Sequence, residues 1–252
     1  MSANEGEYSY TYNIALDCYL TVLIMSATVG ARQPVVLVTG SAGHLGSALM
    51  MTLPSYGFQV FGIDILESST TDAVLDISDP SQAGRPFSLR PDITHVIHAA
   101  TLHKPHIISH TKSDFIATNI SGTLNLLEAA RDTLAGPLSS FTYISTTSAF
   151  GAALNPGVGH PAAWIDESVP SIAKNIYGAT KAAAEDICAI FNKDLAPDQR
   201  FPITVLRTSR FFPELDDDEA RRGAELRSGD EVDIDENLKV CELAYRRVDI
   251  GM

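Results

Sequence analysis

Three glycines at positions 40, 43 and 46 constrain this chain more than any other feature of its sequence. They follow an apolar, β-branched run at residues 35–39, which is typical of a buried parallel strand. A helix-like run at residues 45–53 comes next and ends near Pro54. Glycine allows a tight turn, a close approach of backbone to a pyrophosphate, and close packing of helix on strand. The pattern therefore predicts a turn whose helix-start N–H groups face the phosphates of a dinucleotide.

A carboxylate follows at the end of the next predicted strand. Residues 58–63 form a second apolar run, and Asp64 comes directly after it, 18 residues beyond Gly46. A carboxylate at this point accepts hydrogen bonds from the hydroxyls of an adenosine ribose. It also repels a 2′-phosphate, so NAD is favoured over NADP as the cofactor. The alternative is an ordinary turn residue at a strand end.

Strand-like and helix-like segments alternate along the rest of the chain. Further strands are predicted at residues 73–77, 94–98, 141–145 and 203–206, and helices at residues 115–131 and 176–195. Alternation of this kind predicts βαβ units with right-handed crossovers. The expected fold class is therefore α/β, as a Rossmann-type doubly wound parallel sheet with helices on both faces.

The charge balance excludes one class of partner. The chain has 252 residues and a formal net charge of −13, which argues against nucleic acid because phosphate contacts need Lys and Arg. Residues 214–236 alone hold eleven acidic residues and three arginines. Cys18, Cys188 and Cys241 are odd in number and widely spaced. They indicate neither a disulfide framework nor a zinc site, and they fit a reducing compartment, with Cys188 and Cys241 expected to be buried.

Residues 1–33 are expected to be an N-terminal extension of unknown role. The segment 14–29 is apolar apart from Asp17, but it is shorter than the about 20 residues that a membrane-spanning helix needs. A secretory signal has a basic residue before its apolar run, and the first one here is Arg32. A packed extra helix, a weak membrane or targeting segment, and sequence upstream of a start at Met25 stay open. A cytoplasmic protein is expected and membrane association is not favoured, with this segment as the contrary feature.

Five segments together resemble the extended short-chain dehydrogenases/reductases. Residues 39–46 resemble the TGxxGxxG fingerprint of that family. The other four segments are residues 98–100 (HAA), 119–130 (NISGTLNLLEAA), 144–151 (ISTTSAFG) and 177–181 (YGATK). The resemblance covers about residues 34–212, which implies an NAD-binding Rossmann domain with catalytic residues over that range. Within the family, the chain most resembles the NAD-dependent epimerase/dehydratase group that includes UDP-sugar 4-epimerases.

Tyr177 and Lys181 are the expected catalytic pair. Their i, i+4 spacing puts them on one face of a helix. A tyrosine is a poor base near its reference pKa of about 10, but an ammonium one turn away, together with an oxidised nicotinamide, favours the phenolate. Tyr177 then takes a proton from a substrate hydroxyl while hydride passes to the nicotinamide. The resemblance implies that Lys181 also holds the nicotinamide ribose.

A hydroxyl at the end of the fifth strand completes the expected catalytic group. Counting back from Gly151 to match the family pattern places Thr146 there, with Thr147 as the fallback and Ser145 and Ser148 as weaker choices. This hydroxyl is expected to donate a hydrogen bond to the reacting oxygen. Family dehydratases carry an Asp-Glu pair directly after it, where this chain has Thr147 and Ser148. Dehydration by that route is therefore not expected, and oxidation/reduction or epimerisation remains.

The cofactor site is assigned partly from the glycine turn and partly from the resemblance. Its expected residues are Gly40, Gly43, His44, Leu45, Gly46, Asp64, Asp76, Ala99, Ala100, Asn119 and Lys181. The alternatives are a plain solvent-facing turn residue for His44 and a structural strand-end residue for Asp76. No metal is expected, although the spacing of His106, His110 and Asp114, near His103, resembles that of metal ligands. Polar residues at the mouth of the site are the favoured interpretation of that loop.

The C-terminal part leaves the function open. Residues 213–252 are expected to be an acidic, partial substrate-binding region, because the family builds its substrate domain from the C-terminal third of a longer chain. Arg207 and Arg210 are expected either to meet a substrate phosphate or to pair with the acidic stretch. The favoured function is an NAD-dependent oxidoreductase or epimerase acting on a hydroxyl-bearing small molecule, with a nucleotide sugar as the expected substrate and a homodimer compatible with it. The alternative is a truncated, catalytically inactive NAD-binding module with a sensing or scaffold role.

Overall fold

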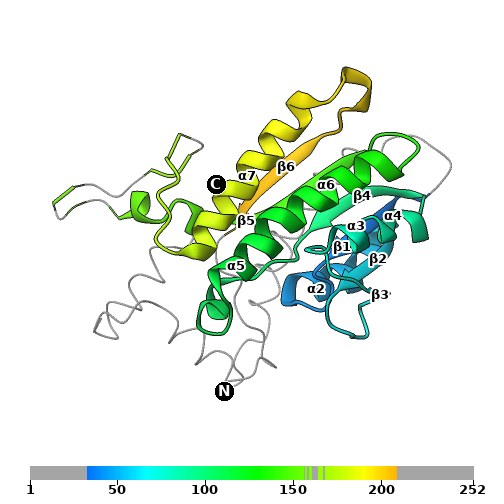
Figure 1. Cartoon of the computed structure of the whole chain (residues 1–252), viewed down its shortest axis with the longest axis horizontal. Coiled ribbons are helices and arrows are strands. Elements are labelled where there is room, and N and C mark those ends of the chain that lie inside the picture. Colours follow the sequence, from blue (N-terminus) through cyan, green and yellow to red (C-terminus); the bar gives the residue numbers. More distant parts are fainter. Residues whose placement is uncertain (1–32, 156, 158, 161–163, 167, 209–252) are drawn as a thin grey trace, which may run out of the picture. The chain divides into compact units, whose positions relative to one another are not determined.

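Six parallel strands form one sheet in the computed structural model, which describes residues 33–208 except 156, 158, 161–163 and 167. The strands lie in the order β3-β2-β1-β4-β5-β6, so the sheet grows outward from its centre in both directions (Figure 1). Their bounds are Val35–Thr39 for β1, Gln59–Asp64 for β2, Ala73–Val74 for β3, Ile93–His98 for β4, Ser140–Thr146 for β5 and Ile203–Thr208 for β6. All six predicted strands are present.

Helices cover both faces of the sheet. Helix α2 (His44–Thr52) connects β1 to β2, whereas α6 (Gly122–Thr133) and α7 (Ile176–Asp194) connect strands that are added in the opposite direction. Because crossovers between parallel strands are right-handed, α2 lies on one face and α6 and α7 lie on the other. The short helices α3 (Pro80–Ala83) and α4 (Arg85–Leu89) lead from β3 to β4 and lie beside α6 (Figure 1). The predicted doubly wound architecture is confirmed.

The centre of the sheet is buried on both faces. All five residues of β1 are buried, and Leu37, Val96 and Phe141, from three neighbouring strands, belong to one apolar cluster. Leu126 of α6 and Phe191 of α7 join the same cluster. Strands that are covered on both faces need continuous apolar runs rather than alternation, which explains why the sequence marks them so clearly. This rigid centre places the carboxyl ends of β1, β2, β4 and β5 along one edge.

The predicted helix at residues 115–131 is interrupted. The chain forms α5 (Lys112–Phe115), then a π-helical turn, η3 (Ile116–Ser121), and then α6. The Thr123 hydroxyl donates to the Asn119 carbonyl oxygen at 2.7 Å, where the helix register changes. Turns of π-helix inside α-helices are frequent at functional sites. Apolar spacing predicts a continuous helix because it records which residues are buried and not which carbonyl each N–H meets.

Other predicted boundaries in the β3–β4 connection are wrong. The third strand ends at Val74 rather than at residue 77, because the chain turns at Asp76, whose Oδ1 accepts from the N–H and the hydroxyl of Ser78 at 2.8 and 2.7 Å. Helices α3 and α4 are absent from the sequence prediction. Proline breaks a helix at most positions, but it fits the first turn, and Pro80 and Pro86 both lie there.

Parts of the sequence prediction concern residues outside the described range. The expected N-terminal extension, apart from Gln33, and the expected acidic C-terminal region lie there, as do Cys18, Cys241 and Arg210. Cys188 is a buried free thiol, as expected. Among the helices that the structure describes, none is long and apolar enough to cross a membrane.

Substitution of Gly46 by alanine is expected to destabilise the fold. A Cβ at this position would lie 1.9 Å from the Gly40 carbonyl oxygen, so turn and helix would have to move apart. Overpacking of this kind costs about 1–3 kcal/mol, and urea denaturation of the full chain should show a loss of that size in the free energy of unfolding. Gly136→Ala is the matched control, because a Cβ there meets nothing within 4 Å. Equal stability of the two variants would contradict the close contact.

Candidate functional site

The glycine turn lies at the carboxyl edge of the sheet between β1 and β4, where the order of the strands reverses direction. Open α/β sheets bind their ligands at this point. Gly40 has a φ of +73°, and a Cβ on it would lie 2.7 Å from the Ala100 nitrogen and 2.9 Å from the Ala99 carbonyl carbon. Gly43 is the N-cap of α2 and offers no side-chain cap, so the first N–H groups of the helix remain available to an anion.

The Asp64 carboxylate is held against the glycine turn. Its Oδ2 accepts a hydrogen bond from the Ala42 N–H at 3.0 Å, and its Oδ1 accepts one from the Leu66 N–H at 2.9 Å. Each carboxylate oxygen has a second lone pair for another donor, and the residue is partly exposed. A structural role at the strand end and a role in ligand binding are therefore compatible. At the start of α2, His44 is exposed and Leu45 is half-buried.

Residues 68–71 brace the glycine turn, and the sequence interpretation missed them. The Thr70 hydroxyl donates to the Ser41 carbonyl oxygen at 2.7 Å, and the hydroxyls of Ser41 and Thr71 lie 3.1 Å apart. Gly62 in β2 permits this contact, since a Cβ there would lie 2.3 Å from the Thr70 carbonyl oxygen. The available signal was Gly62 itself, because a glycine inside a strand often marks a close approach of backbone.

His98 links the glycine turn to α6 through a directed chain of buried hydrogen bonds. The Thr39 hydroxyl accepts from the Ala100 N–H at 3.1 Å and donates to His98 Nδ1 at 2.7 Å. On the other side of the ring, the Thr123 hydroxyl donates to the Asn119 carbonyl oxygen and accepts from His98 Nε2–H at 2.9 Å. These partners select the neutral tautomer protonated on Nε2. Complete burial lowers the pKa of His98 to about 3.

Asn119 is buried, and its amide makes four hydrogen bonds. Its Oδ1 accepts from the Leu102 N–H at 2.8 Å and from the Thr101 hydroxyl at 3.0 Å. Its Nδ2 donates to the Leu102 carbonyl oxygen at 2.9 Å and to Thr180 Oγ1 at 3.0 Å. Asn119 thus connects the loop after β4 to Thr180 of α7, the residue before Lys181. Its contact with a cofactor stays a prediction.

Thr146 and Tyr177 meet at the carboxyl end of β5. Thr146 is the last residue of the strand, and its Oγ1 accepts from the Ser148 N–H at 3.1 Å. Its side chain lies close enough to Tyr177 to oppose the rise of the Tyr177 pKa. Tyr177 lies in the first turn of α7. Gly178 allows α7 to approach this closely, because a Cβ there would lie 2.4 Å from the Ser148 carbonyl oxygen. The structure therefore brings the first-choice hydroxyl, Thr146, to the expected base.

Lys181 lies one turn further along α7, inside the protein. Its Nζ donates to the Ile144 carbonyl oxygen at 2.6 Å and lies 4.1 Å from the centroid of the Tyr143 ring. Burial lowers the pKa of Lys181 to about 7. Burial also raises the pKa of Tyr177, which the Thr146 side chain opposes. The expected lowering of the Tyr177 pKa by Lys181 together with an oxidised nicotinamide stays a prediction.

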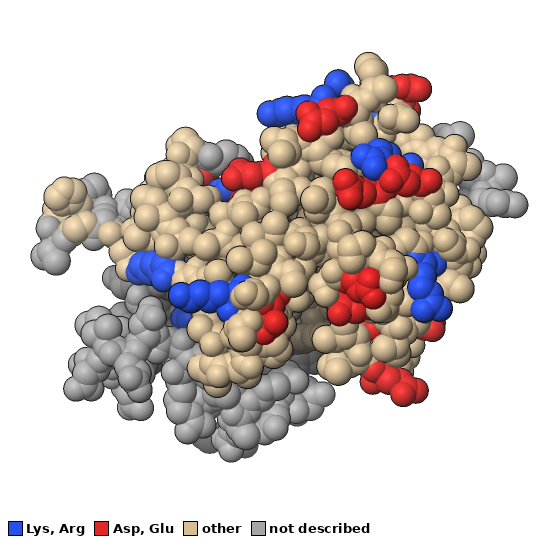
Figure 2. Space-filling view, in the orientation of Figure 1, with Lys and Arg blue, Asp and Glu red and all other residues tan. Residues whose placement is uncertain are grey.

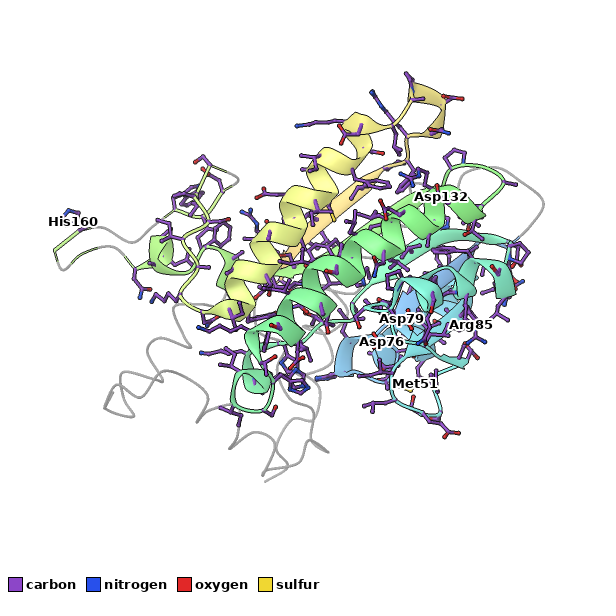
Figure 3. All side chains as sticks on the ribbon, in the orientation of Figure 1. Met51, Asp76, Asp79, Arg85, Asp132 and His160 are labelled. Carbon is purple, nitrogen blue, oxygen red and sulfur yellow. The ribbon has the colours of Figure 1, made fainter. Side chains whose placement is uncertain are left out.

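Two residues with alternative expected roles make contacts within the described part of the chain. Arg207 binds Glu185 of α7, with Nη2 and Oε2 2.6 Å apart, a partner that the sequence did not indicate. The Asp76 side chain accepts from Ser78 and supports the turn before α3, which favours its structural role. Figure 3 shows Asp76 beside Asp79 at the start of that helix.

The histidine loop after β4 does not gather metal ligands. The ring centroids of His103 and His106 are 4.4 Å apart, and those of His106 and His110 are 5.2 Å apart. Asp114 instead lies in the first turn of α5, where its carboxylate accepts from the Thr111 N–H at 2.7 Å. Within the described part of the chain, no group of three or more His, Cys, Asp or Glu side chains is placed to hold a metal ion.

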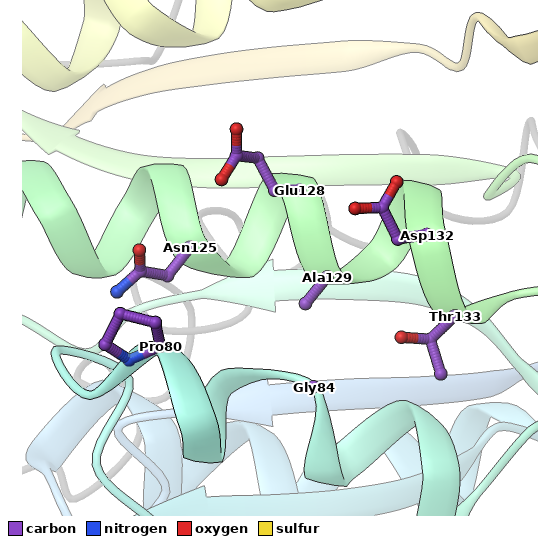
Figure 4. A pocket seen from close by; sticks show the side chains of 7 residues that line it. All are labelled: Pro80, Gly84, Asn125, Glu128, Ala129, Asp132 and Thr133. Atoms are coloured by element: carbon purple, nitrogen blue, oxygen red, sulfur yellow. The ribbon is translucent and has the colours of Figure 1, made fainter.

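A hollow of about 250 Å³ between α3–α4 and α6 shares no residue with this site (Figure 4). Its lining residues are Pro80, Gly84, Asn125, Glu128, Ala129, Asp132 and Thr133. Two carboxylates and no basic side chain among them disfavour a phosphate ligand. Figure 2 shows acidic and basic side chains interspersed on this face, without a continuous basic surface among the described residues.

Comparison with known proteins gives consistent matches. The NAD dependent epimerase/dehydratase family matches residues 36–224. UDP-glucose 4-epimerase uge1 of Schizosaccharomyces pombe is 30% identical over 173 residues, which cover 63% of this chain and 47% of that protein. UDP-glucose 4-epimerases of Thermus thermophilus, complexed with NAD, and of Thermotoga maritima, with UDP-glucose, are 27% and 26% identical. Each has a TM-score of 0.56 and covers 69% of this chain and 54% of that structure. The chain thus spans about half the length of these relatives.

Acidification is expected to weaken the fold through His98. The pKa of His98 is about 3 in the folded chain against a usual 6.5, so only the unfolded chain binds this proton between those values. The stability that the neutral ring contributes is full above pH 6.5 and declines as the pH falls towards 3. Between pH 7 and 5, the free energy of unfolding of the unmodified chain should fall by about 2 kcal/mol more than that of His98→Gln, as measured by urea denaturation.

The control for the His98 experiment is His160→Gln. This residue is exposed on a loop away from the sheet (Figure 3), so its replacement should leave the pH dependence of the chain as it was. An equal pH dependence in the unmodified chain and in His98→Gln would mean that His98 is not held neutral by the fold.

Proposed function

The chain belongs to the NAD-dependent epimerase/dehydratase family, and from this premise we propose that it binds NAD and epimerises, or oxidises and reduces, a hydroxyl-bearing carbon of a nucleotide sugar. The observation that carries the proposal is the approach of Tyr177, in the first turn of α7, to Thr146 at the carboxyl end of β5, with Lys181 one turn further along the helix. We assign the NAD-binding domain with its catalytic residues to residues 34–212.

The glycine turn supports NAD as the cofactor. The backbone at Gly40, Gly43 and Gly46 is bare and so closely packed that a Cβ would collide or crowd at each of them. The uncapped start of α2 suits the pyrophosphate, and we assign the adenosine ribose to Asp64 and the nicotinamide ribose to Lys181. When bound, NAD supplies the acceptor and donor of hydride. The NAD complex of the Thermus thermophilus relative supports NAD as the cofactor.

Tyr177 is proposed as the group that moves the proton. The proton of the substrate hydroxyl passes to the phenolic oxygen of Tyr177, and the Thr146 hydroxyl aligns the reacting oxygen. Because burial raises the pKa of Tyr177, the phenolate depends on nearby positive charge, and Lys181 is the chain's own source of it. In epimerisation the proton returns from Tyr177 to the same oxygen after hydride has come back.

The substrate class follows from the relatives and from one departure in the sequence. The relatives described above are UDP-glucose 4-epimerases, which supports a UDP-hexose as substrate. Thr147 and Ser148, which follow Thr146 in the short helix η4 (Thr147–Ala149), carry no carboxylate that could remove and deliver protons for loss of water. Epimerisation or oxidation/reduction is therefore proposed over dehydration.

A direct test incubates the full chain with NAD and UDP-glucose, and follows UDP-galactose by chromatography and NADH by absorbance. We expect UDP-galactose without net NADH, because an epimerase returns the hydride. Accumulation of NADH together with a keto product would show that the chain is a dehydrogenase and not an epimerase. Binding of NAD without either product, over a panel of UDP-sugars, would contradict the proposal and favour an NAD-binding module without turnover.

Tyr177→Phe is expected to abolish turnover and to leave NAD affinity nearly unchanged. The substitution removes only the proton-accepting oxygen, and general acid–base catalysis contributes about 10²–10⁴-fold to rate. The measurements are turnover in the assay above and the NAD dissociation constant by calorimetry. Tyr56→Phe removes an equivalent hydroxyl from an exposed tyrosine and should retain full activity. Activity of Tyr177→Phe equal to that of this control would remove Tyr177 as the base.

Asp64→Asn is expected to relax the discrimination between NAD and NADP. The variant keeps an oxygen for the Ala42 N–H but loses the charge that opposes a 2′-phosphate. The ratio of the NADP to the NAD dissociation constant should fall by about tenfold, the factor that corresponds to about 1.4 kcal/mol. Asp72→Asn is the control, since its Oδ2 also accepts from a backbone N–H, that of Gly62, at 2.7 Å. An unchanged ratio of the two dissociation constants in Asp64→Asn would mean that Asp64 does not bind the adenosine ribose.

A further inference from the structure

Three ionisable side chains follow one another at four-residue spacing along α7. They are Tyr177, Lys181 and Glu185, one turn apart from each other. Lys181 is 1% exposed and Glu185 is 7% exposed. Charged groups are costly to bury unless they are paired and hydrogen-bonded. The ionisation of Lys181 therefore depends on what surrounds it inside the protein.

The direct contacts of the Lys181 ammonium are uncharged. Nζ donates to the carbonyl oxygen of Ile144 and lies over the ring of Tyr143. A carbonyl dipole and the face of an aromatic ring both attract a cation, but neither carries a full negative charge. These two contacts orient the side chain, and a counter-charge has to come from elsewhere.

Besides Glu185, the titratable groups that interact electrostatically with Lys181 or contact its ammonium are neutral near pH 7. Burial raises the pKa of Cys188, on the same helix, to about 12 and that of Tyr143 well above its usual value. Burial lowers the pKa of His98, from β4, to about 3. Further side chains on the elements packed against α7 are Lys104, His106, Lys112, Asp114, Glu128, Arg131 and Asp132. Cys188 and Glu185 raise the Lys181 pKa against burial, and of these two Glu185 is the one that pairs with an arginine, Arg207.

The Glu185 carboxylate is fixed by two strands. Arg207 of β6 donates from Nε to Oε1 at 3.1 Å and to Oε2 at 2.9 Å, and from Nη2 to Oε2 at 2.6 Å. The Ser145 hydroxyl of β5 donates to Oε1. The guanidinium of Arg207 is itself stacked on Phe150, with its carbon 4.5 Å from the ring centroid. Charge-assisted hydrogen bonds from this set of donors hold the carboxylate in one orientation.

We propose that Glu185 is a positioning residue for the Tyr177–Lys181 pair, and that its buried carboxylate is the counter-charge that keeps the Lys181 ammonium protonated. The inference rests on the proposed function, because it assigns Glu185 a part in the same reaction. Arg207 and Ser145 hold the carboxylate in place. Glu185 touches no reacting atom and acts through Lys181, whose positive charge in turn favours the Tyr177 phenolate.

The test follows the titration of Lys181 directly, by NMR of the full chain with 13C-labelled lysine side chains, with the resonance assigned through Lys181→Arg. In Glu185→Gln the midpoint should fall by about one pH unit, the effect of losing a nearby opposite charge. Glu185→Asp, which keeps the charge, should restore the midpoint towards its original value. Asp186→Asn is the matched control, because it removes the same charge from the exposed neighbouring position and should leave the midpoint in place.

Two results would overturn the inference. One is an unmoved midpoint in Glu185→Gln, and the other is an equal fall in Glu185→Gln and Glu185→Asp, which would assign the effect to packing instead of charge. If Glu185→Gln does not fold, E185Q/R207Q, which leaves neither partner as an unpaired charge, takes its place with the same expectation. Glu185 is among the side chains that shift the Lys181 pKa and Arg207 is not, so loss of the carboxylate dominates.

The titration separates this inference from the proposed function, because it needs neither cofactor nor substrate. If the Lys181 midpoint falls in Glu185→Gln but the unmodified chain turns over no UDP-sugar, Glu185 is the counter-charge of Lys181 and the proposed reaction is wrong. If the unmodified chain turns over a UDP-sugar but the Lys181 midpoint does not move in Glu185→Gln, the proposed reaction stands and Glu185 has no part in it.

Discussion

The glycine turn meets the chain after β4 through backbone alone, and the rest of the site depends on that contact. A Cβ on Gly40 would lie within 2.9 Å of three backbone atoms of Ala99 and Ala100, and one on Gly46 would collide with the Gly40 carbonyl oxygen. Any side chain here would separate β1 from β4 at their carboxyl ends. The Ala100 N–H would then lose the Thr39 hydroxyl, where the buried polar chain of the site begins.

From Thr39, a series of buried hydrogen bonds continues through the protein to α7. His98 joins Thr39 to Thr123, and the Asn119 side chain then reaches Thr180, the residue before Lys181. Buried polar networks hold one arrangement when every member finds a partner. The glycine turn and the first turns of α7 are therefore held in register by the same hydrogen bonds. Beyond Lys181, the Glu185–Arg207 pair extends this polar interior to β6.

The strands and the glycine turn could be predicted because buried parallel strands and tight turns restrict residue types locally. The meeting of Tyr177 and Thr146 was also predictable, since helix spacing and strand ends fix their places. The π-helical turn at Asn119 was not, because it changes the hydrogen-bond register and leaves the same residues buried. The pairing of Arg207 with Glu185 joins separate elements without any local pattern. Spacing likewise shows that a lysine is near Tyr177, but neither where its ammonium points nor how deeply the phenol is enclosed.

The central claim is that the backbone of the glycine turn and the Asp64 carboxylate form an NAD site in this chain. A thermal melt of the full chain with NAD, with NADP and without either tests it most directly. A ligand of the folded state at a hundredfold excess over its dissociation constant adds about 2.7 kcal/mol of stability. We expect a cooperative melt whose midpoint temperature rises with NAD and rises less with NADP. A cooperative melt that neither dinucleotide shifts would contradict it.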